Sequence, residues 1–422
     1  MKIQINPGTA RGRVTAPPSK SMAHRMMICA GLAAGTSVLQ GISDSQDMQA
    51  TLDCLAALGA QWQKDGETVT ITGIGSARTA VHDDAGAAGT QTGEPVLRCR
   101  ESGSTLRFFI PICLQTGRRA QLVGAPRLME RPLQVYAQLC RERGLLFAQE
   151  GQTLTVQGPL PAGSYRLRGD ISSQFISGLL FALPLCEGDS TVTILPPIES
   201  RPYIDMTLAA LKTFGVRAAW QDARTLHIPG GQQYHACDAQ VEGDFSNAAF
   251  FAILDAIRPE NQVQIDGLPP AVDSLQADRV YPALLARLDT PAPCIDLTDC
   301  PDLGPILFAT AAAKHGGRFV GTKRLKIKES DRGAAMAEEL RKCGVSVTVG
   351  EDEILVEPSA SGLQAPIVPL SGHNDHRIVM SAAVLLTLTG GVIEGAEAVS
   401  KSFPDFFDKL QALGIEVKNI EN

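Results

Sequence analysis

The residues of this chain with the greatest chemical potential lie between Lys323 and Arg332. This run contains five cations, and Glu329 and Asp331 stand among them. Alternating charges of this kind usually mark the solvated face of a helix. Here the run lies between an apolar stretch (304–313) and a helical pattern (334–340), so we expect a loop that opens a helix.

Similar cationic clusters recur at residues 18–21, 126–127, 374–377 and 400–402. The formal net charge of the chain is −7, which argues against a general nucleic-acid surface. Aromatic residues make up only 5%, too few for a platform on which bases stack. Basic loops in an acidic protein instead indicate a focused pocket for a small, multiply charged anion.

Length and composition indicate an ordinary globular protein with more than one core. The chain has 422 residues, and domains usually contain roughly 100–200. Its ten cysteines form no Cys-x-x-Cys pair, so we expect reduced structural thiols and no metal site. The first residues lack the apolar run of a signal peptide, and no stretch reaches the ~18 apolar residues of a membrane span. A cytoplasmic protein is expected.

One pattern returns along the chain: a helical period, a glycine, a short strand, a turn and a second strand. The glycines are Gly59, Gly144, Gly215, Gly344 and, in a truncated copy, Gly414. The 129-residue gap between Gly215 and Gly344 is close to two periods, and a helical pattern at 281–288 fits the missing copy. We therefore expect six units of roughly 60–85 residues, although helix-glycine-strand also recurs by chance in α/β proteins.

Six units exceed one core, so two domains of three units each are expected. Gly230-Gly231 is the best punctuation near the middle of the chain, and the strand-like start at 2–5 could belong with the second half. We expect a discontinuous domain of residues 1–19 plus 237–422, and a second domain of residues 20–236.

Several loops could bind an anion, although each has a plainer explanation. Ser19 or Ser21 can cap a helix whose first residues include Lys20 and Arg25, and the N-terminus of a helix favours an anion. Gly103 lies in a small-residue stretch where backbone could approach a ligand closely. Residues 172–174 offer hydroxyl and amide groups, but a simple helix cap would look identical.

The remaining candidates are equally two-sided. Asp302 and Glu329 could form ion pairs or act as acid and base in a cationic pocket. Arg127 and Arg131 fit a salt-bridged turn or a phosphate clamp. His376 is as consistent with a structural role as with catalysis.

Seven motifs, taken in order, resemble the EPSP synthase family. They are Pro18-Ser-Lys-Ser21 with Arg25, Glu130-Arg-Pro132, Ser172-Ser-Gln-Phe175, Arg201-Pro-Tyr-Ile-Asp205, Ile327-Lys-Glu-Ser-Asp-Arg332, Asn374-Asp-His-Arg377 and Ser400-Lys-Ser-Phe-Pro-Asp405. The resemblance implies an α/β fold of two domains, each of three βαβαββ units, around an interdomain cleft.

The resemblance also implies a reaction: transfer of the enolpyruvyl group of phosphoenolpyruvate to the 5-hydroxyl of shikimate 3-phosphate, with release of phosphate. Asp302 would be the base, Glu329 would protonate the methylene carbon, and Lys20 would contact both substrates. The family's binding residues carry over by motif. Shikimate 3-phosphate would be held by Lys20, Ser21, Arg25, Ser172, Ser173, Gln174, Ser200, Asp302 and Lys328. Phosphoenolpyruvate would be held by Lys20, Gly103, Arg127, Gln174, Arg332, Arg377 and Lys401.

No metal or other cofactor is implied, and the expected partners are these two small molecules, without nucleic acid or membrane, on a monomer. The sequence departs from the family pattern in two places. Glu101 and Ser104 change the flanks of Gly103, which leaves the response to the inhibitor glyphosate open, and Arg324 replaces a common asparagine.

Two alternatives stay open at the level of sequence. The related enolpyruvyl transferase that acts on UDP-N-acetylglucosamine uses a Lys-Asn pair near its N-terminus, whereas Ser21 follows Lys20 here. A catalytically inactive anion-binding protein of the same fold would be expected to have lost Asp302 or Glu329.

Overall fold

The computed structural model describes residues 1–75, 93–359 and 361–420, and the chain divides into two compact units. One unit consists of Met1–Pro17 and Glu242–Asn422, and the other of Pro18–Val241. The sequence predicts boundaries after residues 19 and 236. The unit that contains both ends of the chain is called the discontinuous unit, and the unit Pro18–Val241 is called the continuous unit. Each has a hydrophobic core made of its own residues.

The continuous unit contains three four-stranded sheets that share one plan. In each sheet two strands run parallel and an antiparallel hairpin completes the sheet; in the second and third sheets the parallel strands are successive and a helix lies between them in the chain. The first sheet has the order β14-β3-β5-β4, the second β6-β7-β9-β8 and the third β10-β11-β13-β12. The strands are β3 (Thr36–Gln40), β4 (Gln61–Asp65), β5 (Thr68–Thr72), β6 (Val96–Arg100), β7 (Ala120–Gly124), β8 (Leu146–Glu150), β9 (Thr153–Gln157), β10 (Ser164–Arg168), β11 (Ser190–Leu195), β12 (Ala219–Trp220), β13 (Thr225–Ile228) and β14 (Ala239–Gln240).

The first of these sheets is closed by the last strand of the unit. Strand β14 pairs in parallel with β3, with Ala239 opposite Leu39, and the Asp238 carboxylate accepts a hydrogen bond from the Val38 N–H at 2.9 Å. The helices are α1 (Lys20–Leu32), α2 (Gln46–Ala57), α4 (Gly103–Gln115), α5 (Pro126–Met129), α6 (Gln134–Arg143), α7 (Ser173–Ala182) and α8 (Arg201–Thr213), with a 3-10 turn η1 (Leu183–Leu185).

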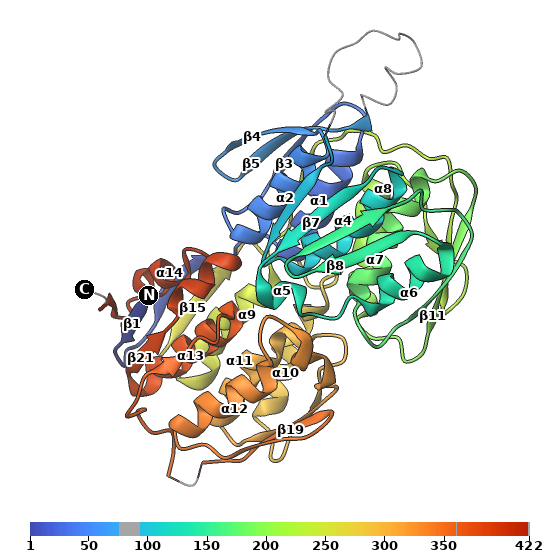
Figure 1. The fold of residues 1–422 in the computed structure, drawn as a ribbon. Helices are drawn as coiled ribbons and strands as arrows, with labels where there is room; N and C mark the ends of the chain where they lie inside the picture. Colours follow the sequence, from blue (N-terminus) through green and yellow to red (C-terminus); the bar gives the residue numbers. More distant parts are fainter. Residues whose placement is uncertain (76–92, 360, 421–422) are drawn as a thin grey trace. The chain divides into compact units, whose positions relative to one another are not determined.

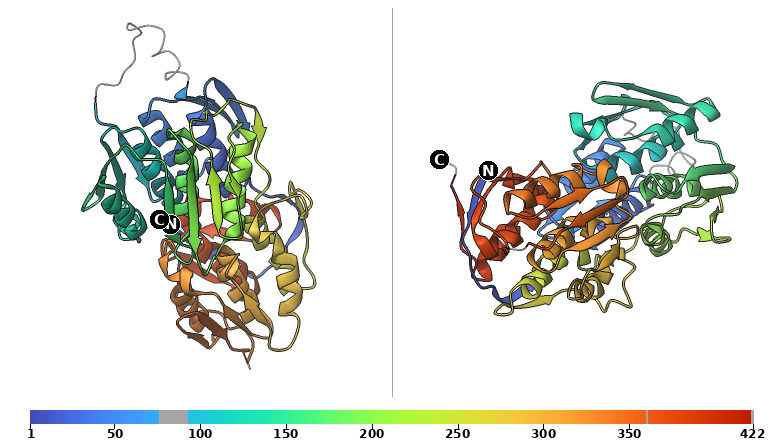
Figure 2. Two further views of the ribbon diagram at one scale, coloured as in Figure 1. Left: turned by 90° about the vertical axis from the view of Figure 1, so that its right-hand side faces the viewer. Right: turned by 90° about the horizontal axis from the view of Figure 1, so that it is seen from below.

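The discontinuous unit repeats the plan, and its last sheet is completed by the N-terminal strand. The order β20-β21-β1-β22 places β1 (Lys2–Ile5) between strands from the end of the chain, with Ile5 opposite both Gly391 and Val417. In Figures 1 and 2 this blue strand runs beside the red C-terminal strands. The copy that looks truncated at Gly414 in the sequence is therefore complete in space.

The fourth copy, in contrast, is reduced. The helix expected at 281–288 is present as α10 (Tyr281–Leu288), but its sheet consists of β2 (Arg11–Thr15) and β15 (Gln262–Asp266) alone. Among the described residues no hairpin follows α10, because the next strand, β16 (Cys294–Asp296), opens another sheet of order β16-β17-β19-β18. The other elements of this unit are β17 (Gly317–Val320), β18 (Val347–Val349), β19 (Glu353–Val356), β20 (Leu370–Ser371), β21 (Gly391–Glu394), β22 (Val417–Asn419), α9 (Phe245–Ile257), α11 (Gly304–Ala313), α12 (Arg332–Lys342), α13 (His376–Thr389) and α14 (Phe406–Ala412), with 3-10 turns η2 (Ala277–Val280), η3 (Pro301–Leu303), η4 (Lys323–Ile327) and η5 (Ala396–Lys401).

The glycine pattern that predicts the repeats has a conformational cause. All five repeat glycines adopt positive φ, from 66° at Gly144 to 108° at Gly59. Each reverses the chain after a helix, where a residue with a Cβ would be strained. The predicted helix-glycine-strand units are confirmed.

Several helices are buried on every side and begin at candidate site residues. Helices α4, α7, α11 and α13 are buried along nearly their whole length, as expected for helices that are apolar all round. Their first turns follow Ser102, Ser172, Leu303 and Asp375. Among the described residues, no helix has both the length and the apolar character needed to cross a membrane.

Candidate functional site

In the continuous unit, three helices begin with a serine cap. The side chains of Ser19, Ser102 and Ser172 accept hydrogen bonds from backbone N–H groups in the first turns of α1, α4 and α7, at 3.3–3.4 Å. The sequence leaves the cap of α1 open between Ser19 and Ser21, and in the structure Ser19 caps the helix. The free N–H groups and the dipoles at such helix starts favour a bound anion.

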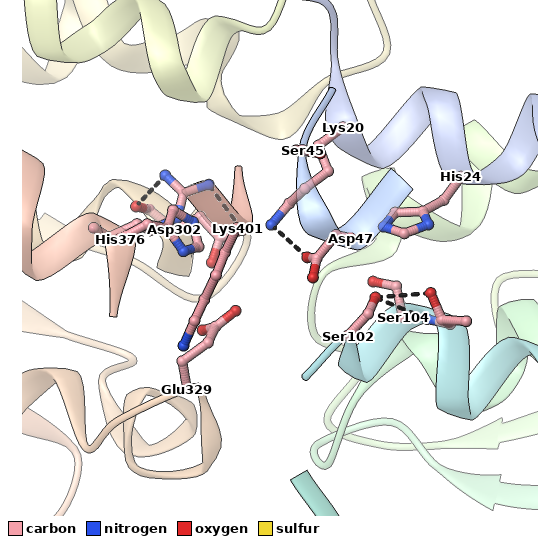
Figure 3. A network of polar contacts seen from close by, with 12 residues as sticks. Lys20, His24, Ser45, Asp47, Ser102, Ser104, Asp302, Glu329, His376 and Lys401 are labelled. Atoms are coloured by element: carbon pink, nitrogen blue, oxygen red, sulfur yellow. Dashed lines mark hydrogen bonds and ion pairs between the residues drawn. The ribbon is translucent and has the colours of Figure 1, made fainter. Parts of the chain in front are cut away.

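Lys20, the first residue of α1, forms an ion pair in this structure. Its Nζ lies 3.1 Å from Oδ2 of Asp47, and both side chains are largely buried. Figure 3 shows this pair beside the start of α4 within the same unit. Asp47 lies in the first turn of α2, and sequence reasoning missed it because an acidic residue there is ordinary for any helix start.

Arg25 is buried and held by the protein itself. Its guanidinium donates to Oγ1 of Thr207 at 2.8 Å and to the carbonyls of Ser21 at 2.5 Å and Tyr203 at 2.9 Å. It also lies 5.4 Å from the ring centre of Phe108, and burial lowers the pKa of Arg25 to about 10. The arginine therefore joins α1 to α8, and its expected contact with substrate stays a prediction.

The amide of Gln174 is oriented from both ends. Its Oε1 accepts a hydrogen bond from Nη1 of Arg107 at 2.6 Å, and its Nε2 donates to Oγ of Ser104 at 2.8 Å. Arg107 is buried and lies over the ring of Phe175. Sequence reasoning assigned no role to Arg107, whose position four residues after Gly103 is also typical of a plain helix surface.

A chain of buried hydrogen bonds supports the start of α4 from behind. Nδ1 of His24 lies 2.8 Å from Oγ1 of Thr51. The same Thr51 oxygen lies 2.8 Å from Oγ1 of Thr105, and Thr105 donates a hydrogen bond to Oγ of Ser102 at 2.8 Å. Burial, with Lys20 and Arg25 nearby, holds the pKa of His24 well below its usual range. A neutral imidazole thus links α1, α2 and α4.

Gly103 is packed against a second arginine. A Cβ at Gly103 would lie 2.6 Å from Nη1 of Arg131, so the guanidinium covers the backbone there. Arg131 is buried, whereas the side chain of Arg127 is 50% exposed and pairs with Glu130 at 3.3 Å. The salt-bridged turn expected as one alternative is thus formed by Arg127, and Arg131 lies nearer to Gly103.

Two more predicted residues lie in the continuous unit. Ser173 is the buried first residue of α7, after its cap Ser172. Ser200 is fully buried and adopts φ +55°, just before α8. A left-handed serine at a helix start is uncommon and requires firm support from its surroundings.

In the discontinuous unit, the candidate residues converge on Arg332. Its side chain is 1% exposed, and it donates to Oδ1 of Asp302 at 2.8 Å, Oε2 of Glu329 at 2.6 Å and Oδ2 of Asp375 at 2.8 Å. Burial alone would lower the pKa of Arg332, but Asp375, Glu329 and Asp302 outweigh it and raise it. Three carboxylates therefore surround one buried cation.

Asp302 itself is shared among several cations. Nζ of Lys328 lies 3.0 Å from Oδ1, and Nη2 of Arg377 lies 3.4 Å from Oδ2. Burial opposes ionisation, but Lys328, Arg377 and Arg332 outweigh it and hold the pKa of Asp302 well below its usual range. The carboxylate is ionised at neutral pH in the free protein.

Lys328 carries the clearest signature of a crowded cationic site. The pKa of Lys328 is lowered to about 8, chiefly by burial and also by the charges of Arg332 and Arg324, against the opposing effect of Asp302. Arg324, buried in η4, is the residue that departs from the family pattern. At this position the chain therefore adds a positive charge beside a lysine that is already destabilised as an ammonium ion.

Two further lysine and histidine contacts complete this part of the unit. Nζ of Lys401 donates to the carbonyl of Asn374 at 2.6 Å, and its side chain is buried. His376 is buried, with Nδ1 3.9 Å from Oδ1 of Asp375, which supports neither of its two roles over the other.

The structure brings five of the six predicted residues of the discontinuous unit into one cluster, hereafter the Arg332 cluster: Asp302, Lys328, Glu329, Arg332 and Arg377. Sequence reasoning missed Asp375, although its place before a helix signals a cap, and also Asp278. Burial, together with the charge of Asp302, raises the pKa of Asp278 to about 7. Nothing in the sequence around Asp278 signals its place beside the cluster.

Such a cluster can bind an anion and move a proton. Its cations can neutralise phosphate or carboxylate groups, and its carboxylates can accept or deliver a proton. Expulsion of water would strengthen each of these interactions.

Comparison with known proteins gives a family for this chain. A model of the EPSP synthase family (3-phosphoshikimate 1-carboxyvinyltransferase) matches residues 5–410. A 3-phosphoshikimate 1-carboxyvinyltransferase of Clostridium botulinum (strain Alaska E43) is 38% identical over 435 residues, covering 98% of this chain and 97% of the relative. The enzyme of the same name from Clostridium kluyveri is 37% identical over 441 residues, covering 98% of each.

Solved structures share the fold. Two structures of EPSP synthase from Acinetobacter baumannii superpose with a TM-score of 0.75 at 24% and 23% identity. They cover 99% and 100% of this chain and the whole of those chains.

The environment of Lys328 predicts a measurable titration. We expect its side chain to titrate near pH 8 by NMR of labelled lysine, and Arg324→Asn to move this titration upward because one neighbouring cation is removed. Lys323→Asn removes an exposed cation from the same 3-10 turn and should leave it unchanged. A Lys328 titration near its ordinary value of 10.5 in the unsubstituted protein would contradict this description of the site.

Proposed function

The chain belongs to the EPSP synthase family, and we propose that the Arg332 cluster and the capped starts of α1, α4 and α7 carry that family's reaction. The reaction transfers the enolpyruvyl group of phosphoenolpyruvate to the 5-hydroxyl of shikimate 3-phosphate and releases phosphate, a step of the shikimate pathway to chorismate. The observation that most supports this assignment is the buried Arg332 guanidinium, which holds Asp302 and Glu329 within one hydrogen-bonded group.

We assign the binding of shikimate 3-phosphate first to the helix starts of the continuous unit. Its phosphate would be bound by serine hydroxyls and backbone N–H groups at Ser172 and Ser173, with the oriented amide of Gln174. Such neutral donors suit an anion that needs hydrogen bonds as well as charge. The other proposed contacts are Lys20, Ser21, Arg25, Ser200, Asp302 and Lys328.

Phosphoenolpyruvate would be bound chiefly by cations. Its phosphate and carboxylate together require several positive charges, and the paired cations Lys20, Arg332 and Arg377 would exchange part of their contact with protein carboxylates for contact with substrate. The proposed set is completed by Lys401, Arg127, Gly103 and Gln174. Arg131 joins it as a support, because its guanidinium lies over Gly103.

The chemistry needs one base and one acid. Asp302 would accept the proton of the 5-hydroxyl as that oxygen bonds to C2 of phosphoenolpyruvate, while Glu329 would donate a proton to C3. The resulting tetrahedral intermediate then loses phosphate: the ionised Glu329 would take a proton from the new methyl group, and Asp302 would return its proton to the leaving phosphate. Across the two steps, one C–O bond forms at C2 and the C–O bond to phosphate breaks.

The depressed pKa of Asp302 makes it a weak base in the free protein, and substrate binding would make it a stronger base. Lys328, Arg377 and Arg332 cause the depression. Anionic substrate groups that neutralise these cations would raise the pKa of Asp302, so that its basicity increases when the hydroxyl is bound.

We further propose that the chain acts as a monomer in the cytoplasm. All ten cysteines lie within the described residues as thiols, and eight of them are buried, as is usual in a reducing compartment. Light scattering of the purified protein should give the mass of one chain, and the mass of two would contradict the monomer.

The two carboxylates have separable roles that substitutions can distinguish. We expect Asp302→Asn and Glu329→Gln each to lower kcat by roughly 10²–10⁴-fold, since each removes a proton transfer while nearly preserving shape. Phosphate release from the two substrates measures this loss. Asp302→Asn should also weaken binding of shikimate 3-phosphate more than Glu329→Gln, because Asp302 would hold the reacting hydroxyl.

The matched control is Glu353→Gln, which removes an exposed carboxylate paired with Arg318 in the same unit. It should leave kcat unchanged. Retention of wild-type kcat by either folded variant in the Arg332 cluster would refute its assigned role.

A methyl group at position 103 tests the proposed phosphoenolpyruvate contact. Gly103→Ala would place Cβ 2.6 Å from Nη1 of Arg131 and force the guanidinium to move. We expect the KM for phosphoenolpyruvate to rise about tenfold or more, the equivalent of one lost charge-assisted hydrogen bond. The dissociation constant of shikimate 3-phosphate should change little.

Gly93→Ala serves as the control, because a Cβ there meets no atom within 4 Å. Steady-state kinetics on both variants, with shikimate 3-phosphate binding measured separately, decide the matter. An unchanged KM in a folded Gly103→Ala protein would show that this backbone does not border the phosphoenolpyruvate site.

A further inference from the structure

A strained turn precedes α13 in the discontinuous unit. His373 and Asn374 both adopt left-handed backbone conformations, with φ +47° and +51°. Left-handed backbone is uncommon for residues other than glycine, so two such residues in succession persist where surrounding contacts determine them. The contacts made by neighbouring residues therefore determine the conformation of this turn.

One buried carboxylate, Glu339 of α12, anchors the turn at two points. Its Oε2 accepts a hydrogen bond from the backbone N–H of Ser371 at 2.9 Å, and its Oε1 lies 2.7 Å from Nε2 of His373. The Glu339 side chain is 2% exposed. Lys342 donates to both carboxylate oxygens, at 2.9 and 3.0 Å, so the protein itself supplies a cation to this group.

Two residues of the turn itself contact proposed phosphoenolpyruvate ligands. The carbonyl of Asn374 accepts the hydrogen bond of Lys401, and Asp375 bonds Arg332 and Ser330. Asp375 also accepts a hydrogen bond from the Arg377 N–H at 2.9 Å and so caps α13. A change in the turn would therefore move the partners of three proposed phosphoenolpyruvate ligands together.

We propose that the Glu339–His373 pair is a positioning device that sets Lys401, Arg332 and Arg377 for phosphoenolpyruvate through the turn 371–375. This inference rests on the function proposed above, because it assigns these three cations to phosphoenolpyruvate. In this proposal His373 and Glu339 touch no substrate, and they act only through the turn.

The pair also gives this device a dependence on pH. The hydrogen bond with Glu339 raises the pKa of His373 against the effect of burial, the charges of Glu339 and Glu338 add to the rise, and Lys342 opposes it. Burial alone would raise the pKa of Glu339, but His373, Lys342 and the Ser371 N–H lower it. Because the pKa of His373 is raised, the charged pair is present at low pH and is lost as pH rises through that value.

The first test compares two substitutions of His373. His373→Leu removes the bond to Glu339, and we expect it to raise the KM for phosphoenolpyruvate about tenfold, the equivalent of one lost hydrogen bond to a charged group. Binding of shikimate 3-phosphate in the absence of phosphoenolpyruvate should remain unchanged. His373→Gln keeps a donor for the carboxylate without a titratable ring, and it should restore a KM close to that of the wild type.

The pH profile distinguishes positioning from simple loss of structure. With shikimate 3-phosphate saturating, the wild-type KM for phosphoenolpyruvate should rise as His373 loses its proton, and His373→Gln should lack this rise. NMR titration of the histidine should show a pKa above 6.5 that falls in Glu339→Gln. His227→Leu, which breaks an exposed histidine–carboxylate pair with Asp189 in the other unit, is the matched control and should behave as wild type.

A parallel Lys401→Met variant separates the two possible failures. If Lys401→Met raises the KM for phosphoenolpyruvate and folded His373→Leu does not, the positioning role is wrong while the proposed site stands. If neither substitution changes the KM, the assignment of Lys401 is wrong and the positioning inference falls with it. A raised KM in both, with rescue by His373→Gln, supports the device.

Discussion

The burial of one guanidinium, that of Arg332, is the constraint on which the charged part of the discontinuous unit depends. An isolated charge in a protein interior is too costly to persist, so a buried arginine must be paired and hydrogen-bonded. Asp302, Glu329 and Asp375 provide this pairing from three separate segments of the chain. The requirement to neutralise Arg332 therefore also fixes the two carboxylates to which we assign proton transfer.

Loss of any one partner of the buried Arg332 is costly, and an anionic substrate can take the place of such a partner. Removing one partner from a buried charged group leaves the others uncompensated, and such losses are commonly worth roughly 3–5 kcal/mol. Anionic substrates can replace part of the pairing without leaving a cation exposed to an apolar interior. The free protein is thus prepared for anions by cations that already lie in place, and little reorganisation is needed when charge develops in the reaction.

The same preparation occurs at helix starts in both units. Serine caps open α1, α4 and α7, and aspartate caps open α12 and α13. The proposed ligands Lys20, Gly103, Ser173, Arg332 and Arg377 all lie in the first two residues of these helices. Repetition of one βαβαββ plan explains this, because each copy brings a helix start to the end of a parallel strand, where ligands commonly bind in α/β sheets.

Local patterns in the sequence predict the fold well where local geometry decides it. The five glycines end helices through positive φ, and this signal is visible without any tertiary contact. The completion of the last sheet by β1 and the missing hairpin after α10 depend on pairing between distant strands, which periodicity does not encode. For the site, motifs locate the cations, but they do not reveal partners such as Asp47, Arg107 and Asp375, which distant segments bring into contact.

The most direct test of the central claim is a double-mutant cycle on Asp375 and Arg332, measured as kcat/KM for phosphoenolpyruvate. Asp375 touches no substrate in our account, and Asp375→Asn keeps a side-chain oxygen that can cap α13 while it removes the charge that pairs with Arg332. Asp375→Asn should therefore lower kcat/KM strongly in the wild-type background and little further once Arg332→Met is present, with a coupling energy of about 1–3 kcal/mol. Additive losses from the two substitutions would show that Asp375 and Arg332 act independently, and would contradict the organisation of the site around the buried guanidinium.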